Sequence, residues 1–183
     1  GDVHPLRPQV RRLDAQGVAT FQPVRRLRQL SGSDLAWLAG QGVLFLVAFV
    51  LVPRADGGPG RVQVAGSRAV GTTVFGLGLA LGLASFMALG RQLVPQPTPI
   101  EDGELVDRGP YGVVRHPIYT AVLLMIVGGL ARTPSATGAA VALASAAFFD
   151  RKSAHEERLL AAAYPDYAGY RARVRWALLP GVR

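Results

Sequence analysis

Cysteine is absent from this 183-residue chain, and histidine occurs only three times. A chain without thiols has no disulfide framework, no thiolate metal site and no cysteine nucleophile. Three histidines are too few for a histidine-rich metal centre, and His155 lacks the second histidine of a zinc-protease HExxH motif. A Gly-x-Ser-x-Gly motif, which would indicate a serine hydrolase, is also missing. We therefore expect no metal cofactor and neither of these two kinds of hydrolase.

Charged residues are also scarce. They make up 17% of the chain, against roughly 25% in ordinary soluble domains. Two long runs contain no charge at all, one of 18 residues over 35–52 and one of 20 residues over 70–89. As α-helices they would be about 27–30 Å long, which matches the hydrocarbon core of a bilayer. A soluble helix would show polar residues at every third or fourth position, so these runs predict two transmembrane helices.

Two shorter apolar runs follow, over 118–131 and 136–149, separated by a turn that contains Thr133 and Pro134. Each run has 14 residues, which falls short of a full span and is typical of re-entrant or interfacial segments. The pattern predicts a helical hairpin of about 117–132 and 135–150. Both ends of such a hairpin return to the same side of the membrane.

The polar tail of the chain predicts two short cytoplasmic helices, about 151–164 and 165–177. Proline is tolerated in the first turn of the second helix, and an apolar-aromatic stripe then recurs at helical spacing: Tyr167, Tyr170, Val174 and Ala177. The predicted fold class is therefore an all-α integral membrane protein without a Rossmann domain. It has two full transmembrane helices, a shorter helical hairpin and C-terminal cytoplasmic helices.

The formal net charge of +8 could suggest a nucleic-acid partner, but nearly all of the basic residues are arginines that flank the apolar runs. With an even number of crossings, residues 1–34, 90–117 and 150–183 share one side and hold 16 of the 20 Lys and Arg residues. The positive-inside rule then places both termini in the cytoplasm, and we expect no nucleic-acid partner. The expected organisation is a basic N-terminal segment, 1–34, before a single membrane domain, 35–183. The Arg-, Ala- and Gly-rich composition suits a bacterial inner membrane.

The glycines of GLGLALG, residues 76–82, resemble half of a dinucleotide-binding fingerprint. Their spacing is wrong for that motif, and they lie inside an apolar helix and not after a strand. Gly78 and Gly82 form instead a small-xxx-small pair, which favours close helix packing in lipid.

Two polar clusters lie at the two ends of the predicted hairpin. Arg115 and His116 lead into it, and Glu156 and Glu157 follow it, so the topology alone brings the four side chains together. Taken singly, they also fit headgroup anchoring and a solvated helix face. Together they suit a polar ligand of mixed charge, with one carboxylate facing the ligand and the other paired with a cation such as Arg115 or Arg151. Carboxylates so close to arginine would stay ionised.

These clusters carry a family resemblance. The stretch RGPYGVVRHPIY resembles the GPY…RHPxY signature of the integral-membrane methyltransferases, which include isoprenylcysteine carboxyl methyltransferase and the phospholipid methyltransferases. The stretch EERLLAAAYPDYAGYRARVRWALLPG resembles the second signature of that family. The similarity covers residues from about 104 to 181, in the family's order and spacing.

The resemblance implies S-adenosylmethionine as the cofactor, enclosed by the C-terminal half of the chain, with S-adenosylhomocysteine as product. By analogy, the cofactor-binding residues are Leu105, Val106, Gly109, Tyr111, Arg115, His116, Pro117, Tyr119, Glu156 and Glu157. The catalytic candidates are Glu156 and His116, as bases toward an amine or hydroxyl acceptor, and Arg173, toward an anionic one. The expected partners are membrane lipids and a lipophilic methyl acceptor with a carboxylate, amine, hydroxyl or thiol group.

Two rival functions remain open. One is a phospholipid N-methyltransferase in particular. The other is a non-catalytic membrane protein that retains the fold as a binding or assembly module.

Overall fold

The computed structural model describes residues 32–52, 64–90 and 105–181. All but the last three residues of the predicted N-terminal segment lie outside these ranges. The described residues form helices and one isolated bridge between Val114 and Trp176, with no extended strand. The elements are α1 (Gly32–Leu46), a π-helical turn η1 (Val47–Leu51), α3 (Ser67–Leu89), a 3₁₀ turn η3 (Gly109–Gly112), α4 (Pro117–Ala131), α5 (Ala136–Ala163) and α6 (Tyr167–Arg173).

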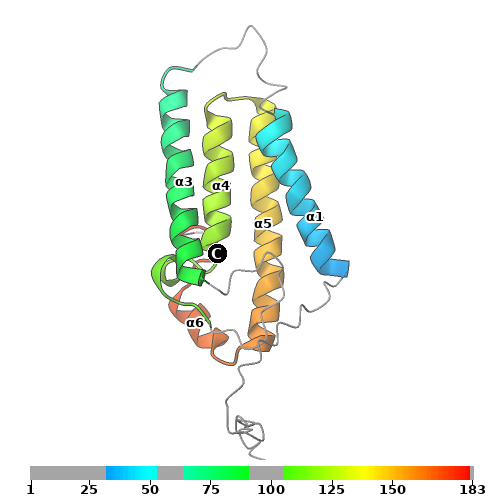
Figure 1. Ribbon diagram of the computed structural model, residues 1–183, viewed down its shortest axis with the longest axis vertical. Coiled ribbons are helices and arrows are strands. Elements are labelled where there is room, and N and C mark those ends of the chain that lie inside the picture. The colour runs from blue at the N-terminus through cyan, green and yellow to red at the C-terminus, as the bar shows by residue number, and fades with distance from the viewer. Residues whose placement is uncertain (1–31, 53–63, 91–104, 182–183) are drawn as a thin grey trace, which may run out of the picture.

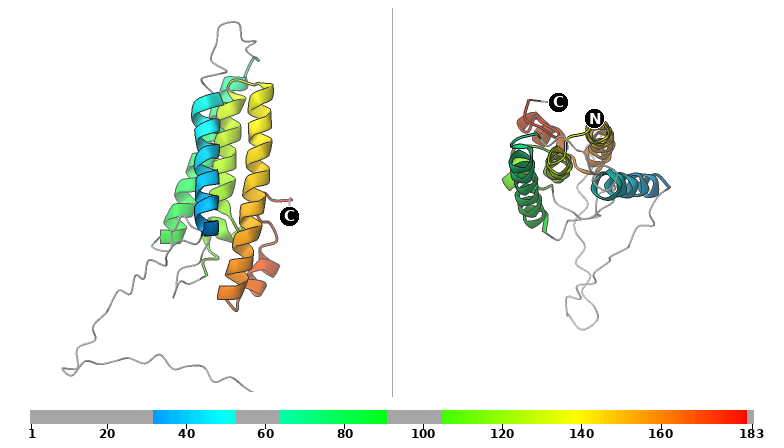
Figure 2. Two further views of the ribbon diagram at one scale, coloured as in Figure 1. Left: turned by 90° about the vertical axis from the view of Figure 1, so that its right-hand side faces the viewer. Right: turned by 90° about the horizontal axis from the view of Figure 1, so that it is seen from above.

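Four long helices lie side by side in the order α3, α4, α5 and α1 (Figure 1). α4 and α5 form the predicted hairpin, and α1 packs on α5 through an edge-on contact of Trp37 with Phe148, 5.4 Å between ring centroids. The last third of α5 extends beyond its neighbours at the end where α3 finishes and α4 begins (Figures 1 and 2). α6 lies beside this extension, so the polar part of the described chain gathers at one end of the bundle.

Two segments are long and apolar enough to cross a membrane: Gly32–Leu51, which joins α1 and η1, and α3. Only 11% of the most apolar window of the first and 17% of that of the second is buried. The central helix of a soluble protein would be mostly buried, whereas these helices expose large apolar side chains such as Val43 and Leu77. An α-helix satisfies its own backbone hydrogen bonds, so such a surface is suited to lipid. The two predicted apolar helices are thus present.

α3 and α4 approach each other through glycines. A Cβ atom on Gly78 would lie 2.8 Å from the carbonyl oxygen of Ala121, and one on Gly128 would lie 2.4 Å from the backbone nitrogen of Phe75. The predicted packing role of Gly78 is confirmed. Gly82 is less tightly packed, since its Cβ would lie 3.5 Å from the Ala121 Cβ. Such close backbone contact gives van der Waals attraction that lipid alone does not provide.

The predicted break between the helices 135–150 and 151–164 is wrong, because α5 is one helix of 28 residues. Ser135 caps it, its Oγ accepting a hydrogen bond from the backbone N–H of Gly138 at 2.9 Å. From Ala139 to Ala163 the sequence contains neither proline nor glycine and is rich in alanine, the strongest helix former. At Asp150 the sequence of α5 changes from apolar to charged residues, but the backbone of the helix continues without a break.

The predicted helix 165–177 is too long, because α6 ends at Arg173. All four residues of the predicted stripe are buried, yet Val174 and Ala177 lie beyond the helix. They belong to the C-terminal segment, residues 174–181, which runs along the start of α4. The propensity of the sequence favours a longer helix, and tertiary hydrogen bonds override it.

Those hydrogen bonds come from residues that precede or begin α4. The backbone N–H of Arg115 donates to Trp176 O and that of His116 to Ala177 O, each at 2.9 Å. The Thr120 hydroxyl donates to Leu178 O. The C-terminal segment therefore exchanges helical hydrogen bonds for contacts that fix the residues around Arg115 and His116.

Candidate functional site

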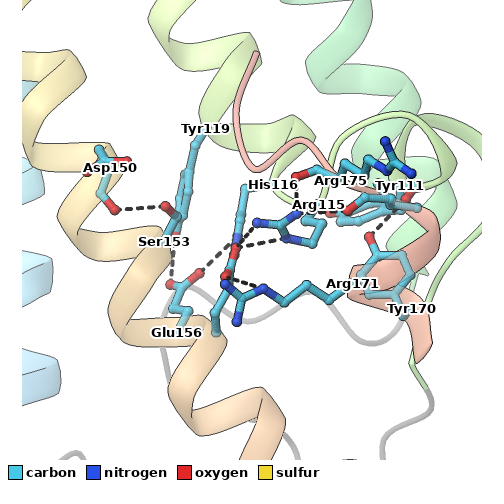
Figure 3. Close-up of polar contacts among 12 residues, drawn as sticks. Tyr111, Arg115, His116, Tyr119, Asp150, Ser153, Glu156, Tyr170, Arg171 and Arg175 are labelled. Atoms are coloured by element: carbon cyan, nitrogen blue, oxygen red, sulfur yellow. Dashed lines mark hydrogen bonds and ion pairs between the residues drawn. The ribbon is translucent and has the colours of Figure 1, made fainter. Parts of the chain in front are cut away.

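The two polar clusters meet where the start of α4 faces the extension of α5. Pro117 begins α4, which suits a residue without a backbone N–H, so Arg115 and His116 stand just before the helix. Arg115, His116 and Tyr119 all point toward α5, where Glu156 lies (Figure 3). The juxtaposition predicted from topology is therefore present.

Arg115 and Glu157 form a buried ion pair. The guanidinium reaches Glu157 Oε1 through Nε at 2.9 Å and through Nη2 at 2.8 Å. Its Nη1 donates to the carbonyl oxygens of Val174 at 2.8 Å and Arg175 at 2.6 Å. Arg115 and Glu157 are each only 5% exposed. One side chain thus joins α4, α5 and the C-terminal segment.

His116 lies between the two carboxylates. Its Nδ1 is 3.5 Å from Glu156 Oε2, and its Nε2 is 3.4 Å from Glu157 Oε1. Nε2 is buried and makes no hydrogen bond of good geometry within the described residues. The ring stacks on Tyr119 at 5.6 Å, and the Tyr119 hydroxyl donates to Glu156 Oε1. Each of the two glutamates therefore has its own partner, with the imidazole between them.

The surroundings shift the pKa values of the two glutamates in opposite directions. Burial raises the pKa of Glu156, and the His116 charge and the Tyr119 hydrogen bond oppose this only in part. Burial acts on Glu157 in the same direction, but the adjoining His116 and Arg115 outweigh it and hold the Glu157 pKa at about 2. Glu157 is thus fixed as an anion by Arg115, whereas Glu156 is the carboxyl group whose protonation can change.

A Glu157→Gln variant should be less stable than wild type by an amount that depends on pH. The folded-state pKa of Glu157, about 2, lies below its ordinary value of 4.5, so its contribution is complete above pH 4.5 and is lost as pH falls toward 2. We expect the gap in melting temperature between the two proteins, measured in detergent, to close over that acid range. Arg158→Gln, which alters an exposed neighbour, should show no such closing gap. A gap that stays constant down to low pH would contradict the pairing.

Arg173 does not join this cluster. It is exposed and pairs with Asp107, Nη2 to Oδ2 at 2.7 Å. The pair lines a pocket of about 680 Å³ together with Leu105, Tyr164, Pro165, Asp166 and Gly169. The three predicted catalytic residues are therefore divided, with Glu156 and His116 in the buried cluster and Arg173 at the pocket.

The other predicted cofactor residues lie around and between these two places. Leu105 lines the pocket and packs against the buried cluster of Tyr167, Tyr170 and Val174. The Tyr170 hydroxyl donates to the carbonyl oxygen of Tyr111 at 2.8 Å, which fixes η3. The remaining predicted residues are Val106, half-buried, Gly109, exposed with a positive φ of 60° at the start of η3, and Pro117, buried in the first turn of α4.

The sequence places Lys152 in the second polar cluster, with Arg151, Glu156 and Glu157, but it predicts no role for Lys152 and does not indicate Gln41. Lys152 is 1% exposed, and its Nζ donates to Gln41 Oε1 of α1 at 2.6 Å. The same ammonium lies 5.1 Å from the centre of the Tyr119 ring. Two signals in the sequence were available: Lys152 is the single lysine of the chain, and it precedes Glu156 by one helical turn.

Comparison with known proteins identifies one family and two relatives. The family described as phospholipid methyltransferase matches residues 67–167. Over 74 residues the chain is 42% identical to the cobalt-zinc-cadmium resistance protein CzcN of Cupriavidus metallidurans, which covers 40% of this chain and 34% of the relative. Over 71 residues it is 41% identical to the nickel-cobalt-cadmium resistance protein NccN of Alcaligenes xylosoxydans xylosoxydans, covering 38% and 33%.

The aligned part thus spans about a third of the length of these curated relatives. No solved structure gives a significant match. The family match covers more than half of the chain and includes both polar clusters, from Arg115 and His116 to Glu156 and Glu157. The resemblance read from the two signatures is confirmed, and the chain belongs to the phospholipid methyltransferase family of integral-membrane methyltransferases.

Proposed function

We propose that the protein is an S-adenosylmethionine-dependent methyltransferase that acts on a lipophilic acceptor at the cytoplasmic face of the membrane. The observation that carries the proposal is the buried convergence of Arg115, His116, Glu156 and Glu157 at the polar end of an apolar bundle. Arg115, His116 and Glu157 are buried and Glu156 is largely so; burial of ionisable side chains costs free energy, and such clusters gather at functional sites. The family membership supports methyl transfer as the reaction.

The side chains present fit the cofactor chemically. S-adenosylmethionine carries an ammonium, a carboxylate and a sulfonium, and it therefore needs partners of both signs. The cluster offers two carboxylates and an imidazole, and the nearby pocket carries both Asp107 and Arg173. Its volume of about 680 Å³ lies within the usual range of ligand sites, about 300–1,000 Å³. His116 Nε2 and the Tyr167 hydroxyl are buried without a hydrogen bond in the described part of the chain, so the cluster holds two polar atoms that its own contacts leave unsatisfied.

When bound, the cofactor supplies a methyl group that is transferred by direct displacement at the carbon next to sulfur. The chain's own residues would bind and align the two reactants and exclude water, which lowers the barrier by proximity. Glu157 is held by Arg115 and serves to keep the C-terminal segment and α5 together. Glu156, held by Tyr119 and His116, is the carboxylate that meets the cofactor's ammonium group or takes a proton from the acceptor.

The need for a base depends on the acceptor. A carboxylate acceptor is already nucleophilic, and Arg173 at the pocket would orient it. An amine or hydroxyl acceptor must lose a proton, and Glu156 and His116 are the candidate general bases. Glu156 Oε2 and His116 Nδ1 lie 3.5 Å apart. The acceptor itself would approach from the lipid, between the apolar helices.

Calorimetric titration of S-adenosylmethionine and S-adenosylhomocysteine into the detergent-solubilised protein tests the proposal. Glu156→Gln and His116→Asn should each weaken binding roughly tenfold or more, since each removes a charge-assisted contact in a buried site. Arg158→Gln is the matched control, because it changes an exposed charge on the same helix, and it should bind as wild type does. Absence of binding in a folded wild-type protein would overturn the methyltransferase proposal and favour a non-catalytic role.

The acceptor is identified by following a labelled methyl group into membrane extracts. Label that alkali releases as methanol would indicate a methyl ester, whereas label that resists alkali and remains in phospholipid would indicate the runner-up, a phospholipid N-methyltransferase. Cofactor binding without any transfer would support the binding module.

The two relatives are named for resistance to divalent metals. Within the described residues no three His, Cys, Asp or Glu side chains are grouped to hold a metal ion. We therefore propose that this protein contributes to resistance against divalent metals by methylating a membrane component. Titration with zinc, cobalt and cadmium tests this view, and tight binding of any of them would contradict it.

A further inference from the structure

The chain's single lysine is buried beside the site. Lys152 lies three residues past the apolar run that ends at Phe149. Its neighbour Arg151 is exposed, as a cation at such a boundary ordinarily is, whereas Lys152 is only 1% exposed. Burying an ammonium costs several kcal/mol by order of magnitude unless it finds partners, so this position requires an explanation.

The partners of Lys152 come from three helices. Gln41 of α1 accepts a hydrogen bond from Nζ at 2.6 Å, and the Tyr119 ring of α4 faces the ammonium at 5.1 Å. Glu156 follows Lys152 by four residues on α5, a spacing that places both on one face of the helix. Tyr119 connects the two, because its ring faces Lys152 and its hydroxyl donates to Glu156 Oε1.

The charges of Lys152 and Glu156 support each other. Burial lowers the pKa of Lys152, and the Glu156 charge opposes that change. Burial raises the pKa of Glu156, and four groups oppose it: His116, just before α4, Tyr119 of α4, and Lys152 and His155 of α5. Within the described residues, Gln41 contributes only a neutral amide to Lys152 from α1. Lys152 is thus a buried cation that acts on Glu156 from the preceding turn of α5.

We propose that Lys152 is a positioning residue of the site, which holds Tyr119 and keeps the Glu156 carboxylate ionised, with Gln41 of α1 holding the ammonium in place. The inference rests on the proposed function in one respect, that Glu156 is the carboxylate that meets the cofactor. The coupling between Lys152 and Glu156 is a property of the folded chain alone and can be measured without any ligand.

The first experiment measures the titration of Lys152, which can be observed alone because it is the single lysine of the chain. Protein labelled with ¹³C at lysine Cε gives a single side-chain resonance, and its titration in detergent reports the protonation of Lys152. A Glu156→Gln variant removes the carboxylate charge and keeps its shape, so the midpoint of the Lys152 titration should move to lower pH. Arg158→Gln should leave the midpoint where it is. An unchanged midpoint in Glu156→Gln would overturn the proposed coupling.

The second experiment follows cofactor binding as a function of pH. A Lys152→Met variant removes the ammonium, so Glu156 should take up its proton at higher pH than in wild type. S-adenosylhomocysteine should then bind several-fold more weakly at the acidic end of the range and as wild type does at the alkaline end. Lys152→Arg, which keeps the charge, should restore most of the binding at low pH, and Arg151→Met should match wild type throughout.

The two experiments separate the possible failures. If wild type binds no cofactor but the lysine midpoint shifts in Glu156→Gln, the proposed function fails and the coupling stands. If the cofactor binds and Lys152→Met weakens it equally at every pH, Lys152 is a structural residue and the positioning role is wrong.

Discussion

An Arg115→Met variant is expected to lose about 3–5 kcal/mol of its free energy of unfolding, the usual cost of removing one partner of a buried ion pair. Glu157 would be left buried beside the His116 imidazole, without its guanidinium partner, and the carbonyl groups of Val174 and Arg175 would lose their donor. The C-terminal segment should therefore loosen along with the ion pair. Denaturant unfolding in detergent gives the free energy, and amide hydrogen exchange over residues 174–178 reports the segment.

The matched control is Arg175→Met. The side chain of Arg175 is exposed, and Arg115 contacts only its backbone carbonyl. The free energy of unfolding of Arg175→Met should therefore differ from that of wild type by less than about 0.5 kcal/mol. Arg115→Lys should recover part of the loss, since it keeps the charge but not the planar fork that reaches Glu157 and the two carbonyls together. Equal stability of Arg115→Met and Arg175→Met would show that the ion pair does not hold this end of the protein together.

The second large effect is expected at Gly128, where one methyl group should cost about 1–3 kcal/mol or more. In Gly128→Ala the new Cβ would lie 2.4 Å from the backbone nitrogen of Phe75 and 2.7 Å from the carbonyl oxygen of Gly71. Backbone atoms cannot rotate out of the way as a side chain can, so α3 and α4 must move apart. Thermal unfolding in detergent should show the loss.

The neighbouring residue provides the control. Gly129→Ala adds the same methyl group to the same helix, but its Cβ would lie 3.9 Å from Phe75 Cδ2, an ordinary contact. Alanine also favours the helix over glycine, so this variant should be unchanged or more stable by up to about 1 kcal/mol. If the two variants unfold alike, the close approach of α3 and α4 does not contribute to stability.

The features that could be predicted from the sequence were those with a strong local signal. Uncharged runs of helical length predicted the apolar helices, and the hairpin topology then required Arg115 and His116 to meet Glu156 and Glu157. The predicted alternatives for the cation partner of a glutamate were Arg115 and Arg151, and the structure pairs Glu157 with Arg115 while Arg151 is exposed. Connectivity alone sufficed for this part of the site.

The features that were missed depend on long-range contacts. The stripe from Tyr167 to Ala177 has helical spacing, and no local signal shows that Trp176 and Ala177 give their carbonyls to Arg115 and His116. The burial of Lys152, which belongs to the second polar cluster of the sequence, could not be predicted for a related reason. Its sequence neighbours Asp150 and Arg151 suggest a solvated boundary, whereas contacts with Gln41 of α1 and Tyr119 of α4 bury it.

The continuity of α5 has a consequence for the bilayer in which the protein works. One rigid rod carries both Leu143, which is 73% exposed within the apolar part, and Glu156, which belongs to the polar cluster. Its apolar part, residues 136–149, is about 21 Å long, shorter than a typical hydrocarbon core of about 30 Å. A thicker or thinner bilayer changes this mismatch and with it the tilt of the helix. Because no joint separates the two parts, a change in the tilt of the apolar part carries Glu156 with it, so we expect acyl-chain length to affect the position of this carboxylate.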